Sequence, residues 1–186
     1  MPFEGDERLV KDLKSGKQKA FDEIVLKYKD KIFNTAYRFL GEWQDANDLT
    51  QETFIAVYKN IRKFRGESAV STWIYRIAVN LCKNKLGSLE NRNREKTVSV
   101  DEKILNIKNK NDTPHKLLEK KELEITVQKA IDSLPADWKD VVVLKDIEDM
   151  PYEEIASVLN CEVGTVKSRL HRARMALREK LAGLVE

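Results

Sequence analysis

The sequence contains few cysteines, glycines and prolines: two, seven and four among 186 residues. Cys82 and Cys161 lie far apart and belong to no CxxC pair or Cys/His cluster, so the common zinc and redox motifs are unsupported. No apolar run is long enough to span a bilayer, and the N-terminal residues MPFEGDERLV lack the apolar segment of a signal peptide. We therefore expect a cytoplasmic protein that needs no metal or other cofactor.

Catalytic motifs are absent as well. The sequence shows no Gly-rich phosphate loop and no set of residues arranged around a catalytic nucleophile. The carboxylates of the helix expected over 45–63 look like part of a protein interface and are not paired as metal ligands. We therefore expect a chain without catalytic chemistry of its own.

What the sequence does contain is charge and helical periodicity. Charged residues make up 35% of the chain and hydrophobic residues 41%, but the formal net charge is only +3. Because the total charge is so small, only its distribution along the chain can indicate a partner.

The periodicity predicts an all-α protein made of two small helical domains. The first domain covers residues 1–87, and Gly41 is placed to end one of its helices while Asp45 is placed to cap the next. Its helices are expected up to about residue 15 and over 17–40, 45–63 and 71–86.

A polar segment, residues 88–113, separates the two domains. It is rich in Asn and Lys and has little periodicity, so it is predicted to be a flexible linker. Two interpretations of this segment remain open: it docks on a partner through a few apolar residues, or it is a disordered tether. The apolar residues are Val98, Val100, Ile104, Leu105 and Ile107. The second domain, 114–186, is expected to begin with a helix at Pro114, because proline is tolerated in a first turn.

The stretch STWIYRIAVNLCKNKL, residues 71–86, has two faces at helical spacing. The apolar face is expected to pack: Ile74, Ile77, Ala78 and Leu81. The other face carries a ring, cations and amides: Trp73, Arg76, Asn80, Lys83 and Asn84. Such a mixture suits single-stranded nucleic acid, because bases stack on rings while cations follow phosphates. A solvated basic side of an amphipathic helix is the alternative.

The strongest local pattern is PYEEIASVLNCEVGTVKSRLHRARMALREKL, residues 151–181, which predicts a helix-turn-helix. Asn160 stands at the turn, where it tolerates a left-handed conformation. The second helix carries six cations against one anion between Thr165 and Leu181. The outward side of this helix suits binding in the major groove of DNA. The alternative interpretation is a solvated basic helix that docks on an acidic partner. The outward residues are Thr165, Lys167, Ser168, His171 and Arg172, with Arg169, Arg174 and Arg178 flanking them.

The helix expected over 45–63 carries an acidic side. An isoleucine, Ile55, lies there among Asp45, Asp48, Gln51 and Glu52, which suits a protein interface with a polar rim. Because acidic surface repels DNA, this side is expected to contact protein, although an ordinary solvated face fits the pattern equally well.

Three segments of the chain together resemble the extracytoplasmic-function (ECF) class of bacterial RNA polymerase sigma factors. They are DANDLTQETFIAVY, FRGESAVSTWIYRIAVNLCKN and LPADWKDVVVLKDIEDMPYEEIASVLNCEVGTVKSRLHRARMAL, in that order along the chain. The resemblance implies a two-domain initiation factor that binds core RNA polymerase and promoter DNA and is held inactive by an anti-sigma factor until a stress signal arrives.

The resemblance also assigns roles to particular residues. It places the polymerase-binding helix on Asp48, Gln51, Glu52 and Ile55. It places recognition of the melted minus-ten element, where an unstacked non-template base is held, on Phe64, Trp73, Arg76, Asn80 and Lys83. It places the helix that reads the duplex minus-thirty-five element on Lys167, Ser168, Arg169, His171 and Arg172.

Two rival interpretations belong to other classes. A repressor or activator would bind duplex DNA with the helix-turn-helix and dimerise through its N-terminal half, and it would need neither Asn80 nor Phe64. An enzyme with a DNA-tethering module would show turnover as the purified chain. Transcription with core polymerase would separate all three.

Overall fold

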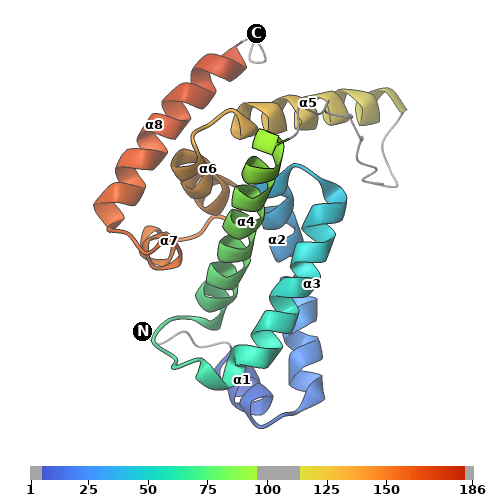
Figure 1. Ribbon diagram of the computed structural model, residues 1–186, viewed down its shortest axis with the longest axis vertical. Coiled ribbons are helices and arrows are strands. Elements are labelled where there is room, and N and C mark those ends of the chain that lie inside the picture. Colours follow the sequence, from blue (N-terminus) through green and yellow to red (C-terminus); the bar gives the residue numbers. More distant parts are fainter. Residues whose placement is uncertain (1–5, 96–113, 183–186) are drawn as a thin grey trace.

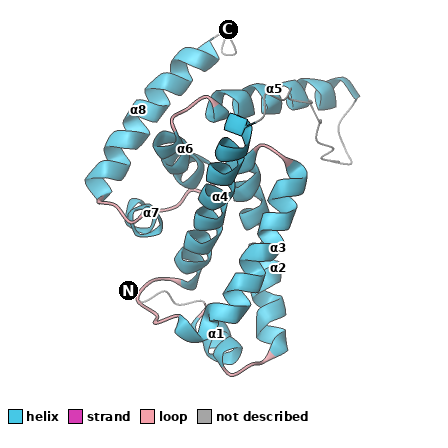
Figure 2. Ribbon diagram, viewed as in Figure 1, coloured by secondary structure: helices cyan, strands magenta, loops and turns pink. Residues whose placement is uncertain are grey.

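The computed structural model describes residues 6–95 and 114–182. The N-terminal half contains α1 (Glu7–Lys14), α2 (Gln18–Leu40), α3 (Trp43–Asn60), the short 3-10 turn η1 (Ile61–Lys63) and α4 (Val70–Glu95). The C-terminal half contains α5 (Pro114–Asp132), α6 (Ala136–Val142), the π-helical turn η2 (Val143–Ile147), α7 (Tyr152–Leu159) and α8 (Val163–Leu181). Across these two ranges every regular element is a helix, which confirms the predicted all-α fold (Figure 2).

The predicted helix ends follow local signals. Gly41 ends α2 with a φ of 76°, the left-handed conformation that glycine adopts without a steric penalty. Asn160 ends α7 with a φ of 51° and allows the chain to turn into α8. The predicted cap at Asp45 is wrong, because α3 begins two residues earlier and Glu42 is its N-cap. Asp45 lies in the first turn instead, where its carboxylate is 2.8 Å from Lys85 Nζ.

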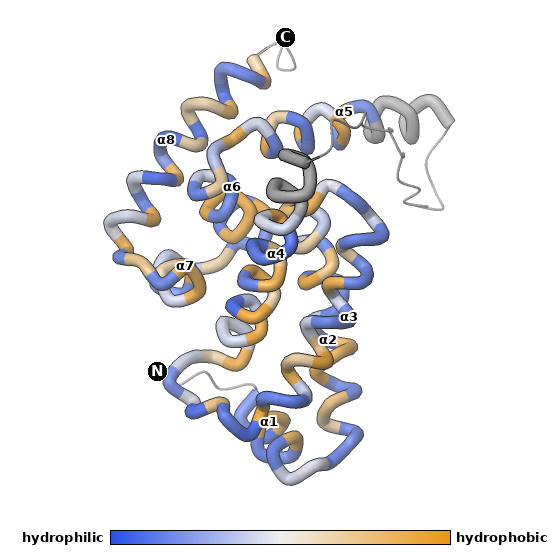
Figure 3. Tube along the Cα trace, in the orientation of Figure 1, coloured by the Kyte–Doolittle hydropathy of each residue, from blue (hydrophilic) through white to orange (hydrophobic). Residues whose placement is uncertain are grey.

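Helix α4 is the central element of the molecule. Figure 1 shows it between the α2–α3 pair and the C-terminal helices α6, α7 and α8, with α5 across one end. Ile74, Ala78, Val79 and Cys82 of α4 are almost completely buried. Hydrophobic segments of α2, α4 and α6 lie toward this interior in Figure 3. A continuous apolar core therefore joins the two halves through α4.

The predicted linker lies mostly outside the described residues. Helix α4 runs to Glu95 and so extends into the range 88–113 that was predicted to be linker. The apolar residues predicted to dock, 98–107, lie in the part of the chain that the structure does not describe. Helix α5 begins at Pro114, as predicted.

Candidate nucleic-acid interface

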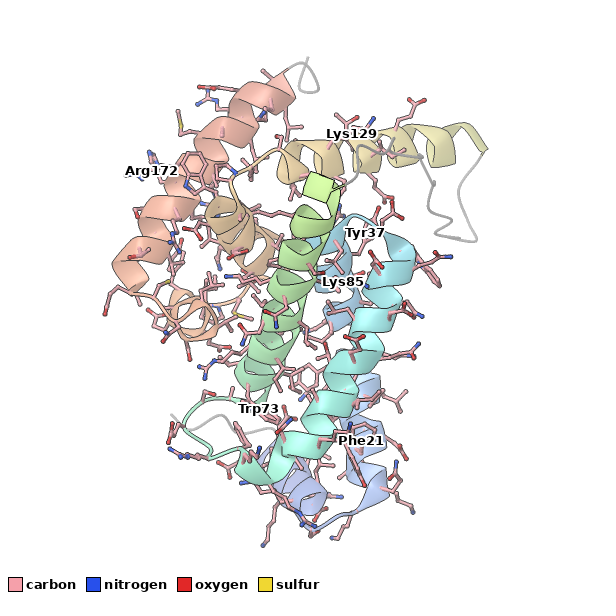
Figure 4. All side chains as sticks on the ribbon, viewed as in Figure 1. Phe21, Tyr37, Trp73, Lys85, Lys129 and Arg172 are labelled. Carbon is pink, nitrogen blue, oxygen red and sulfur yellow. The ribbon has the colours of Figure 1, made fainter. Side chains whose placement is uncertain are left out.

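A pocket lies at the start of α4. Phe64, which follows η1 in extended conformation, packs its ring on Trp73 with the two centroids 5.2 Å apart. Arg76 lies one turn further along α4 and lines the same pocket of about 390 Å³, together with Ser157 of α7. Figure 4 shows Trp73 near this end of α4. The structure thus brings together three of the residues predicted to hold an unstacked base: Phe64, Trp73 and Arg76.

The guanidinium of Arg76 is only partly satisfied. Its Nη2 donates a hydrogen bond of 2.7 Å to the Ser157 hydroxyl. Its Nε is buried and, among the described residues, has no hydrogen-bond acceptor. A buried donor without an acceptor costs free energy, so this arginine would gain from an anionic or carbonyl acceptor placed in the pocket.

The other two predicted minus-ten residues lie further along α4. Asn80 is exposed and leaves its amide available to solvent. Lys83 is half-exposed, and its Nζ lies 2.6 Å from a carboxylate oxygen of Asp140, a side chain that is only 5% exposed. Burial raises the pKa of Asp140, although the hydrogen bond from Lys83 lowers it in part.

Two further carboxylates of the C-terminal half contact α4. Thr72 donates a hydrogen bond of 2.8 Å to Glu154, and the Tyr75 hydroxyl donates one of 2.6 Å to Glu148. Burial and then the bond to Glu148 raise the pKa of Tyr75 well above its ordinary value, so the phenol is neutral and donates its proton.

Helix α8 presents the predicted recognition surface. Lys167, Ser168, His171 and Arg172 are exposed, while Val166, Leu170 and Ala173 are buried on the opposite side. Figure 4 labels Arg172 on α8, on the side of the molecule away from α3. The exposed row has the one-sided character that a groove-binding helix needs.

Two members of this helix are held by neighbouring carboxylates. Arg169 Nη2 donates to Asp137 at 2.6 Å, and Arg174 Nε donates to Asp146 at 3.1 Å. Lys167 lies over the ring of Tyr152, with its Nζ 5.6 Å from the centroid, and Thr165 is half-buried. Arg169 therefore braces α8 against α6.

Helix α3 presents the predicted acidic side to solvent. Asp48, Gln51 and Glu52 are exposed, and Ile55 between them is 52% exposed. Tyr58, one turn further along α3, is 50% exposed and makes an edge-to-face contact with Phe21, with centroids 5.1 Å apart. An exposed isoleucine and tyrosine among carboxylates form a surface suited to another protein.

Comparison with known proteins supplies the family. Two family models match, Sigma-70 region 2 over residues 24–92 and Sigma-70, region 4 over residues 125–177. The RNA polymerase sigma-H factor of Pseudomonas aeruginosa is 38% identical over 190 residues, which cover 98% of this chain and 96% of that protein. The chain belongs to the ECF sigma factors.

Further comparisons agree with this assignment. The ECF RNA polymerase sigma-E factor of Haemophilus influenzae is 38% identical to this sigma factor over 184 residues, covering 97% of each chain. A solved structure of the sigma factor RpoE of Bartonella quintana with the anti-sigma factor NepR has a TM-score of 0.69 at 23% identity, covering 88% of this chain and 98% of that one. That second likeness concerns the fold alone.

The described part of the sigma factor shows neither a membrane span nor a metal centre. None of its described helices is both long and apolar enough to cross a bilayer. Within the same residues, no three His, Cys, Asp or Glu side chains gather where they would hold a metal ion.

Sequence reasoning missed the residues of the C-terminal half that contact α4. Asp140, Glu148, Glu154 and Ser157 received no role from periodicity or resemblance. One signal was present: Asp140 directly precedes the run VVVL, whose four residues are all buried, so its carboxylate had to lie close to the core. The partner of that carboxylate, Lys83, lies 57 positions away in sequence, and periodicity carries no information on such a pairing.

Proposed function

We propose that this ECF sigma factor contacts core RNA polymerase through α3, holds the melted minus-ten strand with α4 and the loop before it, and reads the minus-thirty-five duplex with α8. The observation that carries the proposal is the pocket in which Phe64, Trp73 and Arg76 meet. A ring pair and a guanidinium with an unused donor supply the stacking and the hydrogen bond that an unstacked base requires. Unstacking a base costs a few kcal/mol, which such contacts offset.

The minus-ten role extends along α4 to Asn80 and Lys83. An amide offers both a donor and an acceptor to a base edge, and Asn80 is exposed on the turn that follows Arg76. Lys83 is one turn beyond, where an ammonium suits a phosphate of the same strand. A repressor that bound only duplex DNA would have no use for this row.

Polymerase binding is assigned to the exposed strip Asp48, Gln51, Glu52 and Ile55. The strip joins an apolar centre to a polar, acidic rim, which is the composition of a protein interface. It repels DNA, so it does not compete with α4 or α8 for the promoter.

The minus-thirty-five duplex is assigned to Thr165, Lys167, Ser168, Arg169, His171 and Arg172. Arg and Lys on a groove-bound helix read guanine edges, while hydroxyls hold phosphates. Thr165 and Arg169 are the inner members of the set, because the first is half-buried and the second is paired with Asp137.

The domain division and the setting of the protein follow from these roles. We assign residues 1–87 to polymerase and the minus-ten element, 88–113 to the connection, and 114–186 to the minus-thirty-five element. The protein works in the cytoplasm, where polymerase and promoter are found, and initiates transcription without catalysing a reaction itself. An anti-sigma factor is its expected inhibitor, and the Bartonella sigma factor was solved in complex with an anti-sigma factor, NepR.

Run-off transcription with purified core polymerase on a genomic promoter library tests this function. Wild-type protein is expected to produce discrete transcripts, whereas Asp48→Lys with Glu52→Lys should abolish both transcription and pull-down of core polymerase. Both side chains are exposed, so the free energy of unfolding should change by less than about 0.5 kcal/mol. Wild-type pull-down by the double variant would contradict the role of α3, and a lack of any transcript with the wild type would contradict the function.

A further inference from the structure

Helix α1 lies beside the loop that carries Phe64. Figure 1 shows α1 at the end of the molecule where α3 leads, through η1, into the loop before α4, and α1 packs against both α2 and η1. The last residue of α1, Lys14, contacts this loop across 50 positions of sequence, because its Nζ donates a hydrogen bond of 2.5 Å to the Phe64 carbonyl. The same ammonium lies 5.6 Å from the centroid of the Phe64 ring. One side chain therefore holds both the backbone and the ring of Phe64.

The loop supplies little support for Phe64 by itself. The Phe64 amide bonds back into η1 at 3.1 Å, but the residues that follow, Arg65, Gly66 and Glu67, are exposed. The ion pair between Arg65 and Glu67 has a distance of 3.8 Å and is exposed, so it stabilises the loop very little. A buried backbone carbonyl needs a donor, and for Phe64 that donor comes from α1.

Lys14 is itself held in place by the packing of α1. Leu13, its neighbour in sequence, is only 3% exposed and belongs to the core. At the other end of α1 the N-cap residue Asp6 accepts hydrogen bonds from the Tyr28 hydroxyl at 2.5 Å and from Lys27 Nζ at 2.6 Å. Helix α1 is therefore fixed to α2 and the core at both ends, and Lys14 extends from a fixed support.

Lys14 contacts Phe64 from outside the base pocket. Phe64 and Trp73 line the pocket, whereas Lys14 is not among the described residues that do so. The Phe64 ring is only 7% exposed and contacts both the Lys14 ammonium and the Trp73 ring. A change at Lys14 can therefore displace one wall of the pocket without altering any group that a base would touch.

We propose that Lys14 is a positioning residue of the base pocket: its ammonium fixes the carbonyl and ring of Phe64, so that Phe64 meets Trp73 in the geometry that an unstacked base requires. The inference rests on the proposed role of this pocket in holding the minus-ten strand. A preformed pocket binds a base without the cost of ordering its walls. Without Lys14 the loop adopts several arrangements, and the apparent affinity falls with the fraction of molecules that keep the competent one.

The test uses three variants of the full chain. Lys14→Met keeps most of the length of the side chain but removes its hydrogen-bond donors and its charge. Lys14→Arg keeps the donors and the charge and serves as the rescue. Lys11→Met removes the same charge from another exposed lysine of α1 and is the matched control. Both positions are exposed, so all three variants are expected to fold.

The first measurement is made on the free protein. Fluorotryptophan replaces the three tryptophans, and fluorine NMR then gives one resonance for each, that of Trp73 being identified with Trp73→Phe. The Phe64 ring lies 5.2 Å from the Trp73 ring, so its displacement shifts the Trp73 resonance. Lys14→Met should shift this resonance and leave the other two in place, whereas Lys14→Arg and Lys11→Met should match wild type. A wild-type spectrum for Lys14→Met, or the same shift with Lys11→Met, would overturn the proposal.

The second measurement uses holoenzyme and a fluorescein-labelled promoter fragment whose non-template minus-ten strand is single-stranded. Fluorescence anisotropy gives its affinity, and a fragment that ends before the single strand is the reference. Lys14→Met should lower the affinity for the first fragment about ten-fold, as expected if about one molecule in ten keeps the competent loop, and should leave the reference unchanged. Lys14→Arg and Lys11→Met should stay within about two-fold of wild type on both fragments.

A double-variant cycle separates positioning from direct contact with DNA. If Lys14 acts through Phe64, then Lys14→Met combined with Phe64→Ala should bind no more weakly than Phe64→Ala alone. Losses of affinity that add would show that Lys14 contacts the strand itself and would overturn the proposal.

Wild-type holoenzyme separates failure of this inference from failure of the proposed function. If wild type gains no affinity from the single strand, the proposed function of the pocket is wrong and the inference is wrong with it. If wild type gains affinity and Lys14→Met gains as much, the inference alone is wrong.

Discussion

The two candidate DNA surfaces of this sigma factor differ in how the protein itself uses them. On α8, Lys167, His171 and Arg172 are exposed to solvent. On α4, Arg76 and Lys83 already contact Ser157 and Asp140 of the other half. The cations of the first surface are therefore largely free of contacts with the rest of the protein, whereas two cations of the second surface already have partners within the fold.

The difference has a physical origin in the position of α4. This helix packs against α2 and α3 on one side and against α7 on the other, so its polar residues lie at an internal boundary. Helix α8 packs with one side only, through Val166, Leu170 and Ala173. A helix at the centre of a fold can expose a binding surface only by giving up contacts, which makes such a surface open to regulation.

The largest expected effect on stability comes from a substitution on the buried side of α4. Ile74 is fully buried, so Ile74→Ala should lower the free energy of unfolding by about 2–5 kcal/mol through lost burial and a cavity. Arg172→Ala on α8 is the contrast and should change it by less than about 0.5 kcal/mol. Urea denaturation measures both, and equal effects would show that α4 is no more central than α8.

The next effect concerns the exposed surface. Arg172→Ala should weaken binding to a minus-thirty-five duplex by about 1–3 kcal/mol if the guanidinium contacts a base. A phosphate contact would instead weaken all sequences alike and reduce the slope of log affinity against log salt by about one. Lys19→Ala, which removes an exposed cation from α2, is the control. Wild-type binding by the Arg172 variant would show that α8 is not the recognition helix.

The smallest expected effect is a difference in thiol reactivity between the two cysteines, one on α4 and one next to α8. Cys82 of α4 is fully buried, and burial raises the pKa of its thiol to about 12. Cys161, in the turn before α8, is partly exposed. Titration with a thiol-reactive dye should therefore modify Cys161 quickly and Cys82 only after denaturation, because the thiolate is the reactive form. Mass spectrometry of the labelled peptides identifies the site, and rapid labelling of Cys82 would place it outside the core.

Local signals made much of the fold predictable. Gly41 and Asn160 were identified as helix ends because few residue types adopt the left-handed conformation. The buried row Val166, Leu170 and Ala173 follows from the helical period of 3.6 residues. The cap at Asp45 was wrong because the pairing of its carboxylate with Lys85 depends on how α3 packs against α4. The preference of aspartate for helix N-caps carries no information about that packing.

The candidate site was predictable in part for the same reason. Trp73, Arg76 and Asn80 share a strip of one helix, so their spacing and the family resemblance identified them together. The acids opposite them, Asp140 and Glu154, approach α4 from a distant part of the chain. The run VVVL after Asp140 indicates that its carboxylate lies near the core, but only the tertiary structure shows which residues of α4 these acids contact.

The central claim is that α4 and the loop before it hold an unstacked base of the minus-ten strand. The direct measurement places a fluorescent base analogue at each non-template minus-ten position in turn and follows its unstacking when holoenzyme binds the promoter. One position should brighten with wild-type protein and stay dim with Asn80→Ala or Phe64→Ala, while binding to the upstream duplex is unchanged. Equal brightening with wild type and both variants would contradict the account and leave α4 as a packing helix with a solvated polar edge.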